Sequence, residues 1–356
     1  MPGVVLVRSS RFLGGIERQL LDHARRLREA GWHPHLVCLL RGAGEHPLVT
    51  AARAEGLPAV TVPDPGPLAL RVWRDLAAIL ERTAGALIHT CDYRSDILVG
   101  ARLRGKRPWL AESHGHTVAG PWVALANRAD VRVLRWAAAV VAVSVAWETA
   151  LAAAGVPARR LHVIGNSTAI LPTTPPPPPM ELPSGRHLLF AGRHTPDKGL
   201  DLLLRAWPQV RGPHPNLHLW VLGEPTGKGW ESRLAAQEGV HCVGWQPDIR
   251  PWLVAVDAVV VPSRREAWGM TAFEALATGV PVVATRVGGL PTLCAGAPHA
   301  VLVTPEQPEA LAAGILTVLR PDFPRGPALG VEFRCRPAFD PARRFDRFLA
   351  LYDALG

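Results

Sequence analysis

Residues 259–285 of the chain read VVVPSRREAWGMTAFEALATGVPVVAT. The apolar run Val259–Val261 is bounded by polar residues, which is typical of a buried parallel strand. A polar loop containing Glu266 follows, and the residues from Met270 onward predict a helix that carries Glu274 on its first or second turn. Backbone amides at the start of such a helix can point at an anion, and we expect a phosphate site between the two carboxylates. The amides concerned are those of Gly269, Met270 and Thr271.

A cationic segment lies upstream of this unit. The predicted strand Leu188–Ala191 runs into the loop Gly192–Gly199, which carries Arg193 and Lys198. The planar fork of Arg193 suits phosphate oxygens, and Lys198 would meet them as a compact point charge. The neighbouring glycines and helix start favour an anion clamp at the carboxyl end of this strand. The structural alternative for both segments is a solvated loop, with Glu274 only complementing the helix dipole.

Alternation of strands and helices extends over most of the chain. Apolar runs bounded by polar residues predict strands, and stretches with one apolar face predict helices. In the N-terminal half we expect strands at Val4–Val7, His35–Leu40, Ala86–His89, Trp109–Ser113, Ala138–Val143 and Leu161–Ile164. In the C-terminal half we expect them at His187–Ala191, Leu217–Leu222, Val240–Val243, Ala258–Val261 and Pro281–Ala284. This pattern predicts an α/β fold with two Rossmann-like, doubly wound parallel sheets whose carboxyl ends face a ligand-binding cleft.

Five consecutive prolines, Pro175–Pro179, mark the expected domain boundary. They cannot join a helix or a central strand, and they favour a stiff, extended spacer. A chain of 356 residues suits two domains of ordinary size. We therefore expect an N-terminal domain over residues 1–172, a Pro-rich linker over residues 173–184 and a C-terminal domain over residues 185–338.

The composition favours a soluble, cytoplasmic protein. Apolar residues make up 48% of the chain and charged residues 19%, which supports two packed cores rather than disorder. The five cysteines show no CxxC spacing, so neither a disulfide framework nor a zinc site is expected. The most apolar stretch, Trp136–Trp147, is shorter than the ~20 residues that span a bilayer, and the N-terminus lacks a signal-peptide pattern.

The net charge of +9 is concentrated in the N-terminal half. Residues 1–170 hold 21 basic residues against 13 acidic ones, whereas residues 171–356 hold 18 against 17. Such a surplus can attract an anionic substrate or an anionic membrane surface, while nucleic acid is disfavoured because no recognition motif accompanies it. A compositional bias toward arginine explains the surplus equally well. Four basic residues lie close together in the sequence and are expected to share one surface: Arg102, Arg104, Lys106 and Arg107. Such a surface would attract an anionic acceptor at the inner membrane face.

The motifs of the C-terminal half follow one another in a fixed order between Phe190 and Gly289. They are Phe190–Arg193, Lys198-Gly199, Val221–Gly223, Val243-Gly244, Pro262-Ser263, Glu266 and Glu274 in a Glu-x7-Glu spacing, and Gly288-Gly289. This series resembles the retaining glycosyltransferases of family 4, which have the two-domain GT-B architecture. The resemblance implies a donor site that includes Gly223, with Glu266 on the hydroxyls of the donor sugar and Glu274 on those of the ribose.

The resemblance also assigns residues outside this series. Gly14 and Gly15 match a glycine-rich loop whose amides approach the donor phosphates. His114 matches the active-site histidine, although two other histidines lie close to it in the sequence. Residues 339–356 match a helix that in this fold packs back on the first domain.

We therefore expect a metal-independent enzyme that moves a sugar from a nucleoside diphosphate, UDP or GDP, to a glycan or lipid-linked acceptor. The expected catalytic residues are His114, Glu266, Arg193 and Lys198. Since no carboxylate is placed as a covalent nucleophile, we favour front-face attack in which the departing phosphate takes the acceptor proton. No cofactor besides the donor is expected, and no Asp-x-Asp segment is placed at a strand end to hold a metal. Two alternatives remain: a catalytically inactive sugar-nucleotide-binding subunit, and a sugar-nucleotide epimerase of the same fold.

Overall fold

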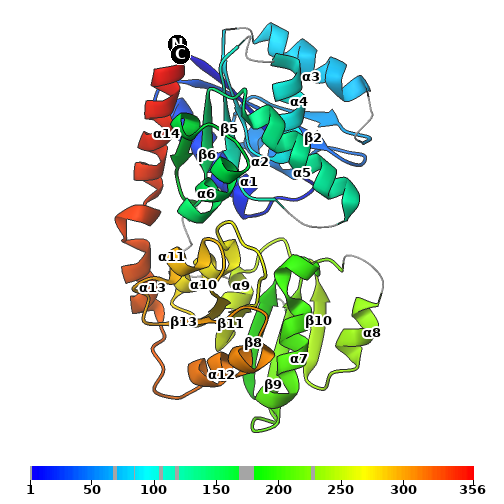
Figure 1. Cartoon of the computed structure of the whole chain (residues 1–356), viewed down its shortest axis with the longest axis vertical. Helices are drawn as coiled ribbons and strands as arrows, with labels where there is room; N and C mark the ends of the chain where they lie inside the picture. The colour runs from blue at the N-terminus through cyan, green and yellow to red at the C-terminus, as the bar shows by residue number, and fades with distance from the viewer. Residues whose placement is uncertain are drawn as a thin grey trace. The chain divides into compact units, whose positions relative to one another are not determined.

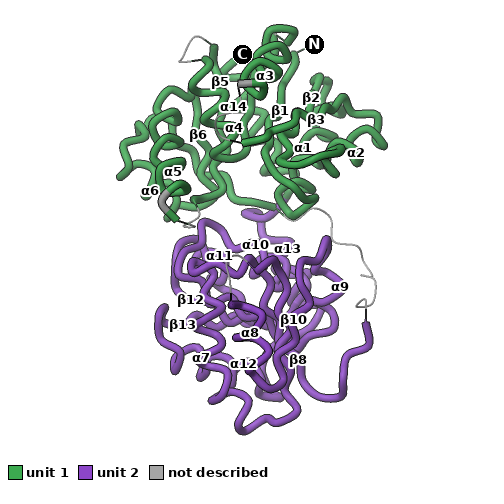
Figure 2. Tube along the Cα trace, turned by 90° about the vertical axis from the view of Figure 1, so that its right-hand side faces the viewer, with its two compact units in different colours: residues 1–116, 120–169, 341–356 green, residues 117–119, 170–340 purple. Residues whose placement is uncertain are grey.

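The computed structural model describes residues 2–66, 70–83, 85–103, 107–116, 120–167, 180–225 and 229–356. The five prolines of the expected linker, together with Arg104 and Lys106, lie outside these residues. The chain divides into two compact units, coloured separately in Figure 2. Unit 1 comprises residues 1–116, 120–169 and 341–356, and unit 2 comprises residues 117–119 and 170–340. Each unit is described by itself.

Unit 1 is built on a parallel sheet of seven strands in the order β3-β2-β1-β4-β5-β6-β7. The strands are β1 (Gly3–Ser9), β2 (His33–Leu40), β3 (Ala59–Pro63), β4 (Leu87–Thr90), β5 (Trp109–Ser113), β6 (Ala139–Ala142) and β7 (Leu161–Val163). Alternate side chains of β1 enter different cores: Val4 and Leu6 pack with helix residues such as Leu20, whereas Val5 and Val7 belong to a second cluster. Both faces of the sheet are therefore covered, which is why its strands read as continuous apolar runs.

Seven helices accompany the sheet of unit 1 in the described residues (Figure 1). They are α1 (Gly15–Glu29), α2 (Pro47–Ala54), α3 (Leu70–Arg82), α4 (Tyr93–Leu103), α5 (Pro121–Leu134), α6 (Val145–Ala153) and α14 (Pro341–Leu355). The C-terminal helix α14 buries Phe348 and Tyr352 in the same cluster as the apolar face of α1. The last helix of the chain therefore forms part of the first core.

Unit 2 is built on a parallel sheet of six strands in the order β10-β9-β8-β11-β12-β13. The strands are β8 (Arg186–Ala191), β9 (Leu217–Leu222), β10 (Val240–Gly244), β11 (Ala258–Val261), β12 (Val282–Thr285) and β13 (Ala300–Val303). The helices are α7 (Leu200–Arg211), α8 (Trp230–Ala235), α9 (Arg250–Leu253), α10 (Met270–Thr278), α11 (Leu290–Cys294), α12 (Pro308–Val318) and α13 (Pro327–Arg334). Helices α7 and α12 share one buried cluster with Leu188 and Phe190 of β8. The expectation of two parallel-sheet α/β domains is confirmed.

Several elements differ from the sequence predictions. The segment between β2 and α3 forms helix α2 and strand β3, which the sequence pattern did not predict because both are short and carry little periodicity. The segment after Gly289 forms α11, which was not predicted either. Helix α14 begins at Pro341 rather than at residue 339, because Pro337–Phe339 forms a separate 3₁₀ turn.

The apolar stretch Trp136–Trp147 contains the buried strand β6. Within the described residues, none of the helices combines the length and the apolar character that a membrane crossing requires.

Candidate functional site

In unit 2 the strand order reverses between the neighbouring strands β8 and β11. Loops that leave such a pair of parallel strands emerge at the same edge of the sheet and run in opposite directions, so their side chains can meet there. The loop after β8 carries Arg193 and Lys198, and the loop after β11 carries Glu266. The topology therefore explains why residues far apart in the sequence converge on one place.

Lys198 and Glu266 are in direct contact. Lys198 Nζ lies 2.6 Å from Glu266 Oε2, and the two side chains are only 24% and 14% exposed. At this distance the pair forms a charge-assisted hydrogen bond. The sequence predicted the two residues as separate contacts, one to phosphate and one to sugar hydroxyls. In this structure their charges neutralise each other.

Gly288 and Gly289 fix the backbone of Glu266. Gly288 has φ +54°, and a Cβ atom placed on it would lie 1.6 Å from the carbonyl oxygen of Glu266. The N–H of Gly289 donates to the same oxygen at 3.1 Å. A side chain at position 288 would therefore displace the loop that carries the carboxylate. This explains why the motif has glycine at position 288.

The loop after β8 is held by Gly223 at the end of β9. Gly223 has φ +130°, and a Cβ atom on it would lie 1.9 Å from the carbonyl oxygen of Gly192. The N–H of Gly192 donates to Leu222 O at 3.0 Å, which keeps the two strand ends in register. Arg193 follows directly and is exposed, and it has no ion-pair partner within the part of the chain that the structure describes. The guanidinium is thus presented from a fixed backbone.

Helix α10 begins beside the same strand end. Its first turn is tied to β8 because the Thr271 hydroxyl donates to Ala191 O at 3.0 Å. Gly269 precedes the helix with φ +103°, and no side chain caps the first turn. The amides of Gly269, Met270 and Thr271 are outside the helix's own hydrogen-bond ladder and lie at its positive end. The anion site predicted at this helix start stays a prediction.

Glu274 lies one turn into α10 and is half-buried. The pKa of Arg250 is raised, chiefly by its hydrogen bonds to Asp248 and to a smaller extent by the Glu274 carboxylate. Arg250 binds Asp248 through two nitrogens, with Nε 2.8 Å from Oδ1. Glu274 therefore lies close to a cation different from the one that pairs with Glu266.

In unit 1 the glycine loop starts helix α1. The N–H of Gly14 donates to Glu17 Oε2 at 2.9 Å, and the other oxygen of Glu17 accepts from Arg8 Nε at 2.9 Å. Arg8 also lies 3.9 Å from Asp92, which follows β4 at the neighbouring strand end. The amide of Gly14, predicted to approach donor phosphates, is therefore already hydrogen-bonded within the protein. This cluster was not predicted, although the Gly-x-x-Glu spacing of a capping box is visible in the sequence.

The three histidines around β5 occupy different environments. His89 Nδ1 lies 2.6 Å from the hydroxyl of Tyr352, and His116 Nε2 lies 2.6 Å from the buried carboxylate of Asp130. Both ring nitrogens of His114 are buried without a hydrogen-bond partner among the described residues. Burial lowers the pKa of His114 to about 4, so its imidazole is neutral at pH 7. Of the three, His114 is the one that makes no ring hydrogen bond to another described residue.

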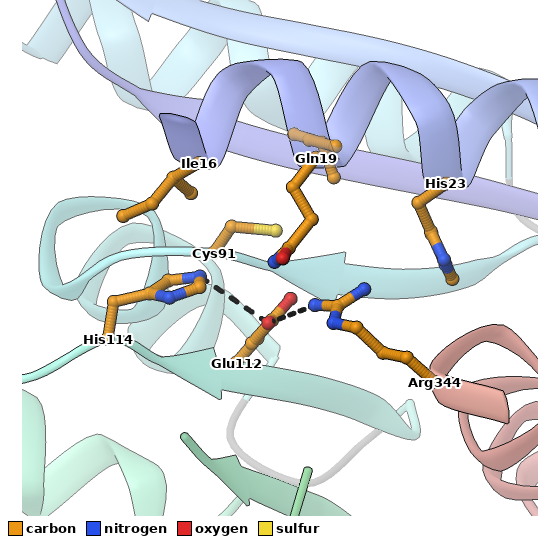
Figure 3. A pocket seen from close by; sticks show the side chains of 8 residues that line it. Ile16, Gln19, His23, Cys91, Glu112, His114 and Arg344 are labelled. Carbon is orange, nitrogen blue, oxygen red and sulfur yellow. Dashed lines mark hydrogen bonds and ion pairs between the residues drawn. The ribbon is translucent and has the colours of Figure 1, made fainter. Parts of the chain in front are cut away.

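Figure 3 shows the pocket that His114 lines. Glu112 extends from β5 between His114 and Arg344, which comes from α14. Glu112 Oε1 lies 2.5 Å from an Arg344 nitrogen and 3.5 Å from His114 Nε2. Gln19 and His23 of α1 line the same pocket. The sequence analysis did not select Glu112 or Arg344, although a charged residue inside the apolar strand WLAES was a signal for Glu112.

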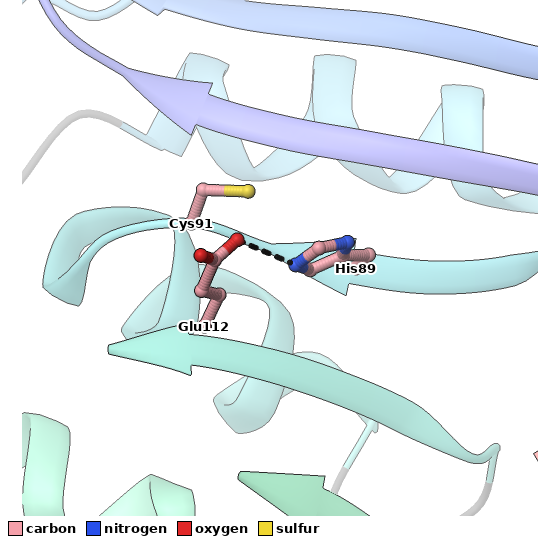
Figure 4. A group of neighbouring side chains, drawn as sticks. All are labelled: His89, Cys91 and Glu112. Carbon is pink, nitrogen blue, oxygen red and sulfur yellow. Dashed lines mark ion pairs between the residues drawn. The ribbon is translucent and has the colours of Figure 1, made fainter. Parts of the chain in front are cut away.

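Three buried side chains of this region form a group with metal-ligand chemistry (Figure 4). The ligand atoms of His89, Cys91 and Glu112 lie within 4.8 Å of one another. Glu112 already pairs with the Arg344 guanidinium, and burial raises the pKa of the Cys91 thiol well above its usual value. Because a metal site needs a thiolate and an available carboxylate, this group fits a buried polar network better than a metal centre.

The structure describes two of the four residues of the predicted basic surface, Arg102 and Arg107. Arg102 pairs with Glu81 at 3.0 Å. Arg107 donates to backbone carbonyls, among them that of Leu80 at 3.0 Å. The prediction was wrong for Arg107 because its guanidinium ties α3 to the following turn instead of facing solvent. Arg104 and Lys106 lie outside the described residues.

Two family models match the chain. The model described as Glycosyltransferase Family 4 matches residues 13–168, and that described as Glycosyl transferases group 1 matches residues 185–321. The chain belongs to glycosyltransferase family 4. The two matches cover strands β2–β7 of unit 1 and all six strands of unit 2, including the loops that carry His114, Lys198 and Glu266.

Curated relatives share part of their length with this chain. A D-inositol 3-phosphate glycosyltransferase of Segniliparus rotundus is 39% identical over 147 residues, which are 38% of this chain and 33% of that protein. The protein of the same name from Geodermatophilus obscurus is 37% identical over 183 residues, 47% of this chain and 40% of that protein. The aligned region thus spans two fifths or less of the length of these relatives.

Solved structures share the whole fold. The crystal structure of Anabaena HepE in complex with UDP-glucose has a TM-score of 0.78 and 20% identity, and the match covers 100% of both chains. WaaG, a glycosyltransferase involved in lipopolysaccharide biosynthesis, has a TM-score of 0.71 and 15% identity, with 98% of this chain and 99% of that one covered. These likenesses show that the fold is GT-B.

Proposed function

We propose that this protein transfers a sugar from a nucleoside diphosphate to an acceptor, with retention of the anomeric configuration. The observation that carries the proposal is the contact of Lys198 with Glu266, at the carboxyl edge where the strand order reverses. A cation for a diphosphate and a carboxylate for sugar hydroxyls are placed there side by side. The start of α10 and the exposed Arg193 belong to the same edge.

In the proposed reaction, negative charge develops on the β-phosphate of the leaving nucleoside diphosphate. Lys198, Arg193 and the first amides of α10 would stabilise that charge, because preorganised donors act most strongly where charge forms in the transition state. Lys198 would exchange Glu266 for phosphate oxygens, and the released carboxylate would accept hydrogen bonds from the donor sugar. Glu274 would hold the ribose hydroxyls.

Retention is proposed to follow from attack on the same face as the departing group. The acceptor oxygen forms the new bond to the anomeric carbon, the bond to the phosphate oxygen breaks, and the phosphate takes the acceptor proton. Glu266 is a poor candidate for a covalent nucleophile in this proposal, because its carboxylate would be engaged by hydroxyls of the donor sugar once Lys198 turns to the phosphate. The neutral state of His114 supports a role in hydrogen bonding to the donor sugar rather than in charge stabilisation.

We further propose that the acceptor is anionic. The curated relatives act, by their names, on D-inositol 3-phosphate. In unit 1 a groove of about 370 Å³ runs along α5 and is lined by three arginines, Arg128, Arg132 and Arg135, and by His116. This groove supports the proposal of an acidic or lipid-linked acceptor at the inner membrane face.

Sedimentation with anionic and neutral vesicles at low and physiological salt separates these acceptors. Binding to anionic vesicles alone would support a lipid-linked acceptor, because each basic residue near such a surface contributes ~1 kcal/mol. Negligible binding to both vesicle types would leave a soluble anionic acceptor as the proposal.

The transferase proposal is tested by incubating the chain with UDP-, GDP- and ADP-sugars and measuring released nucleoside diphosphate. Release with one donor supports the proposal, and the anomeric configuration of the product decides between retention and inversion. Binding without release would favour the inactive subunit, and conversion of the sugar while it stays attached would favour the epimerase.

A further inference from the structure

Glu112 is a charged residue inside the first core. It is 3% exposed, and its neighbours on β5, Leu110 and Ala111, are completely buried. A buried carboxylate is unstable without partners, because its hydration is lost. Glu112 has three: Arg344 at 2.5 Å and His114 at 3.5 Å on one oxygen, and His89 at 3.4 Å on the other.

The permanent cation among these partners comes from the far end of the chain. Arg344 lies on α14, 232 positions after Glu112, and is 7% exposed. Its guanidinium also lies over the ring of Phe348, 4.5 Å from the centroid. Burial acts to raise the pKa of Glu112, but Arg344, and to a smaller extent His114 and His89, hold it well below its usual value. Glu112 is therefore ionised, and Arg344 supplies its main counter-charge.

Glu112 Oε1 lies 3.5 Å from His114 Nε2, close enough to influence where the ring carries its proton. A carboxylate next to Nε2 favours the tautomer with the proton on Nε2, which leaves the lone pair on Nδ1. A second proton on the ring would be favoured by the nearby carboxylates and opposed by burial and by the nearby guanidiniums. The charged groups that face His114 come from four elements: Arg8 of β1, Glu17 of α1, Glu112 of β5 and Arg344 of α14.

We propose that Arg344 is a positioning residue for His114: by neutralising Glu112, it keeps the imidazole uncharged, with its proton on Nε2. The inference rests on the proposed function for the role of His114, and on the geometry of unit 1 for the protonation state. If the inference holds, His114 stays neutral only when the C-terminal helix α14 is packed against unit 1. Removing the guanidinium would leave a buried carboxylate that a protonated His114 can neutralise instead.

The test is the protonation of His114, read by NMR of the chain labelled with ¹³C and ¹⁵N in its histidine rings. A His114→Asn variant identifies the signal. We expect His114 to stay neutral between pH 8 and pH 5 in the native chain and in Arg347→Met, which removes an exposed arginine of the same helix. In Arg344→Met the pH midpoint of His114 protonation should rise by more than one pH unit. The Glu112→Gln/Arg344→Met double variant should return it to the native value.

An unchanged His114 midpoint in Arg344→Met would overturn the proposal, as would protonation of His89 in its place. If Arg344→Met does not fold, Glu112→Gln decides through the ¹⁵N shifts: loss of the Nε2–H tautomer supports the proposal, and an unchanged tautomer contradicts it. In Arg344→Met, sugar transfer measured over the same pH range should lose activity at its acid limb in step with His114 protonation. If the native chain transfers no sugar, the proposed function fails, while the NMR result still reports on Arg344.

Discussion

Lys198 Nζ and Glu266 Oε2 lie 2.6 Å apart, although the residues are 68 positions apart in the sequence. The contact joins the loops after β8 and β11, the two strands between which the sheet of unit 2 reverses its order. Each charge satisfies the other in this structure. A diphosphate that draws Lys198 away would expose the Glu266 carboxylate to the sugar on the same donor, so donor binding and sugar recognition are linked through one pair.

The two carboxylates of the Glu-x7-Glu spacing should differ in whether their loss affects turnover or nucleotide affinity. Glu266→Gln removes the charged acceptor for sugar hydroxyls, so we expect turnover to fall at least tenfold with little change in nucleotide affinity. Glu274→Gln should mainly weaken nucleotide binding, because its partner is the ribose. Initial rates and nucleotide titrations on both variants measure the two effects. Identical profiles for the two variants would refute the division of roles.

Gly288 should tolerate no side chain. In Gly288→Ala the new Cβ atom would overlap the carbonyl oxygen of Glu266, so the loop must move, and we expect a loss of about 1–3 kcal/mol in the free energy of unfolding. Gly244→Ala is the matched control, because it also has positive φ but no atom within 4 Å of the new Cβ. Urea unfolding of both variants measures the difference. Equal losses of unfolding free energy in the two variants would show that the close approach of position 288 to Glu266 does not contribute to stability.

Buried His114 should make the fold sensitive to mild acid. Its pKa is about 4 in the fold and about 6.5 in the unfolded chain, so only the unfolded chain gains this proton between those values. The stability it contributes is complete above pH 6.5 and is lost as pH falls toward 4. Between pH 7.5 and pH 5 the loss from this residue should be about 2 kcal/mol.

Urea unfolding of the native chain and of His114→Asn at the two pH values isolates this contribution from other groups. Among those groups is Asp96, whose pKa is raised by burial, so that its effect has the opposite sign. His33→Asn removes an exposed histidine and should leave the pH dependence unchanged. A native stability difference that His114→Asn does not reduce would contradict the assignment of a buried, neutral imidazole.

Transfer should persist in EDTA. The proposed donor site meets the diphosphate with the cations of Arg193 and Lys198 and with helix amides, so it does not need a divalent ion to neutralise the phosphates. We expect initial rates in EDTA to stay within about twofold of those in MgCl₂, a difference of less than ~0.5 kcal/mol in barrier height. A strict Mg²⁺ requirement would show that the cations do not suffice.

The sequence predicted much of unit 2 because its signals are local. An apolar strand, a polar loop and a helix start follow one another within residues 259–285, and each is encoded by neighbouring residues. Parallel-sheet topology then places Glu266 at the same edge as Lys198 without further information. Their direct pairing was not predicted, because the spacing of two motifs does not specify side-chain distances.

Unit 1 was harder to predict because its polar residues depend on distant partners. Arg344 and Glu112 are separated by 232 positions, and nothing local in PARRFDRF indicates which arginine is buried. Arg102 and Arg107 lie close together in the sequence and suggested a basic surface. In the structure Arg102 pairs with Glu81, and Arg107 donates to backbone carbonyls.

The most direct test of the account is the affinity of nucleoside diphosphates for the native chain and for Lys198→Met, measured by titration calorimetry. Arg320→Met is the control, because it removes one exposed positive charge that pairs with Asp322 in unit 2. Loss of a charge-assisted contact worth about 1.5–3 kcal/mol predicts at least tenfold weaker binding of UDP, or of whichever diphosphate binds, in Lys198→Met alone. Equal affinities in all three proteins, or no binding of UDP, GDP or ADP to the native chain, would contradict the donor site described above.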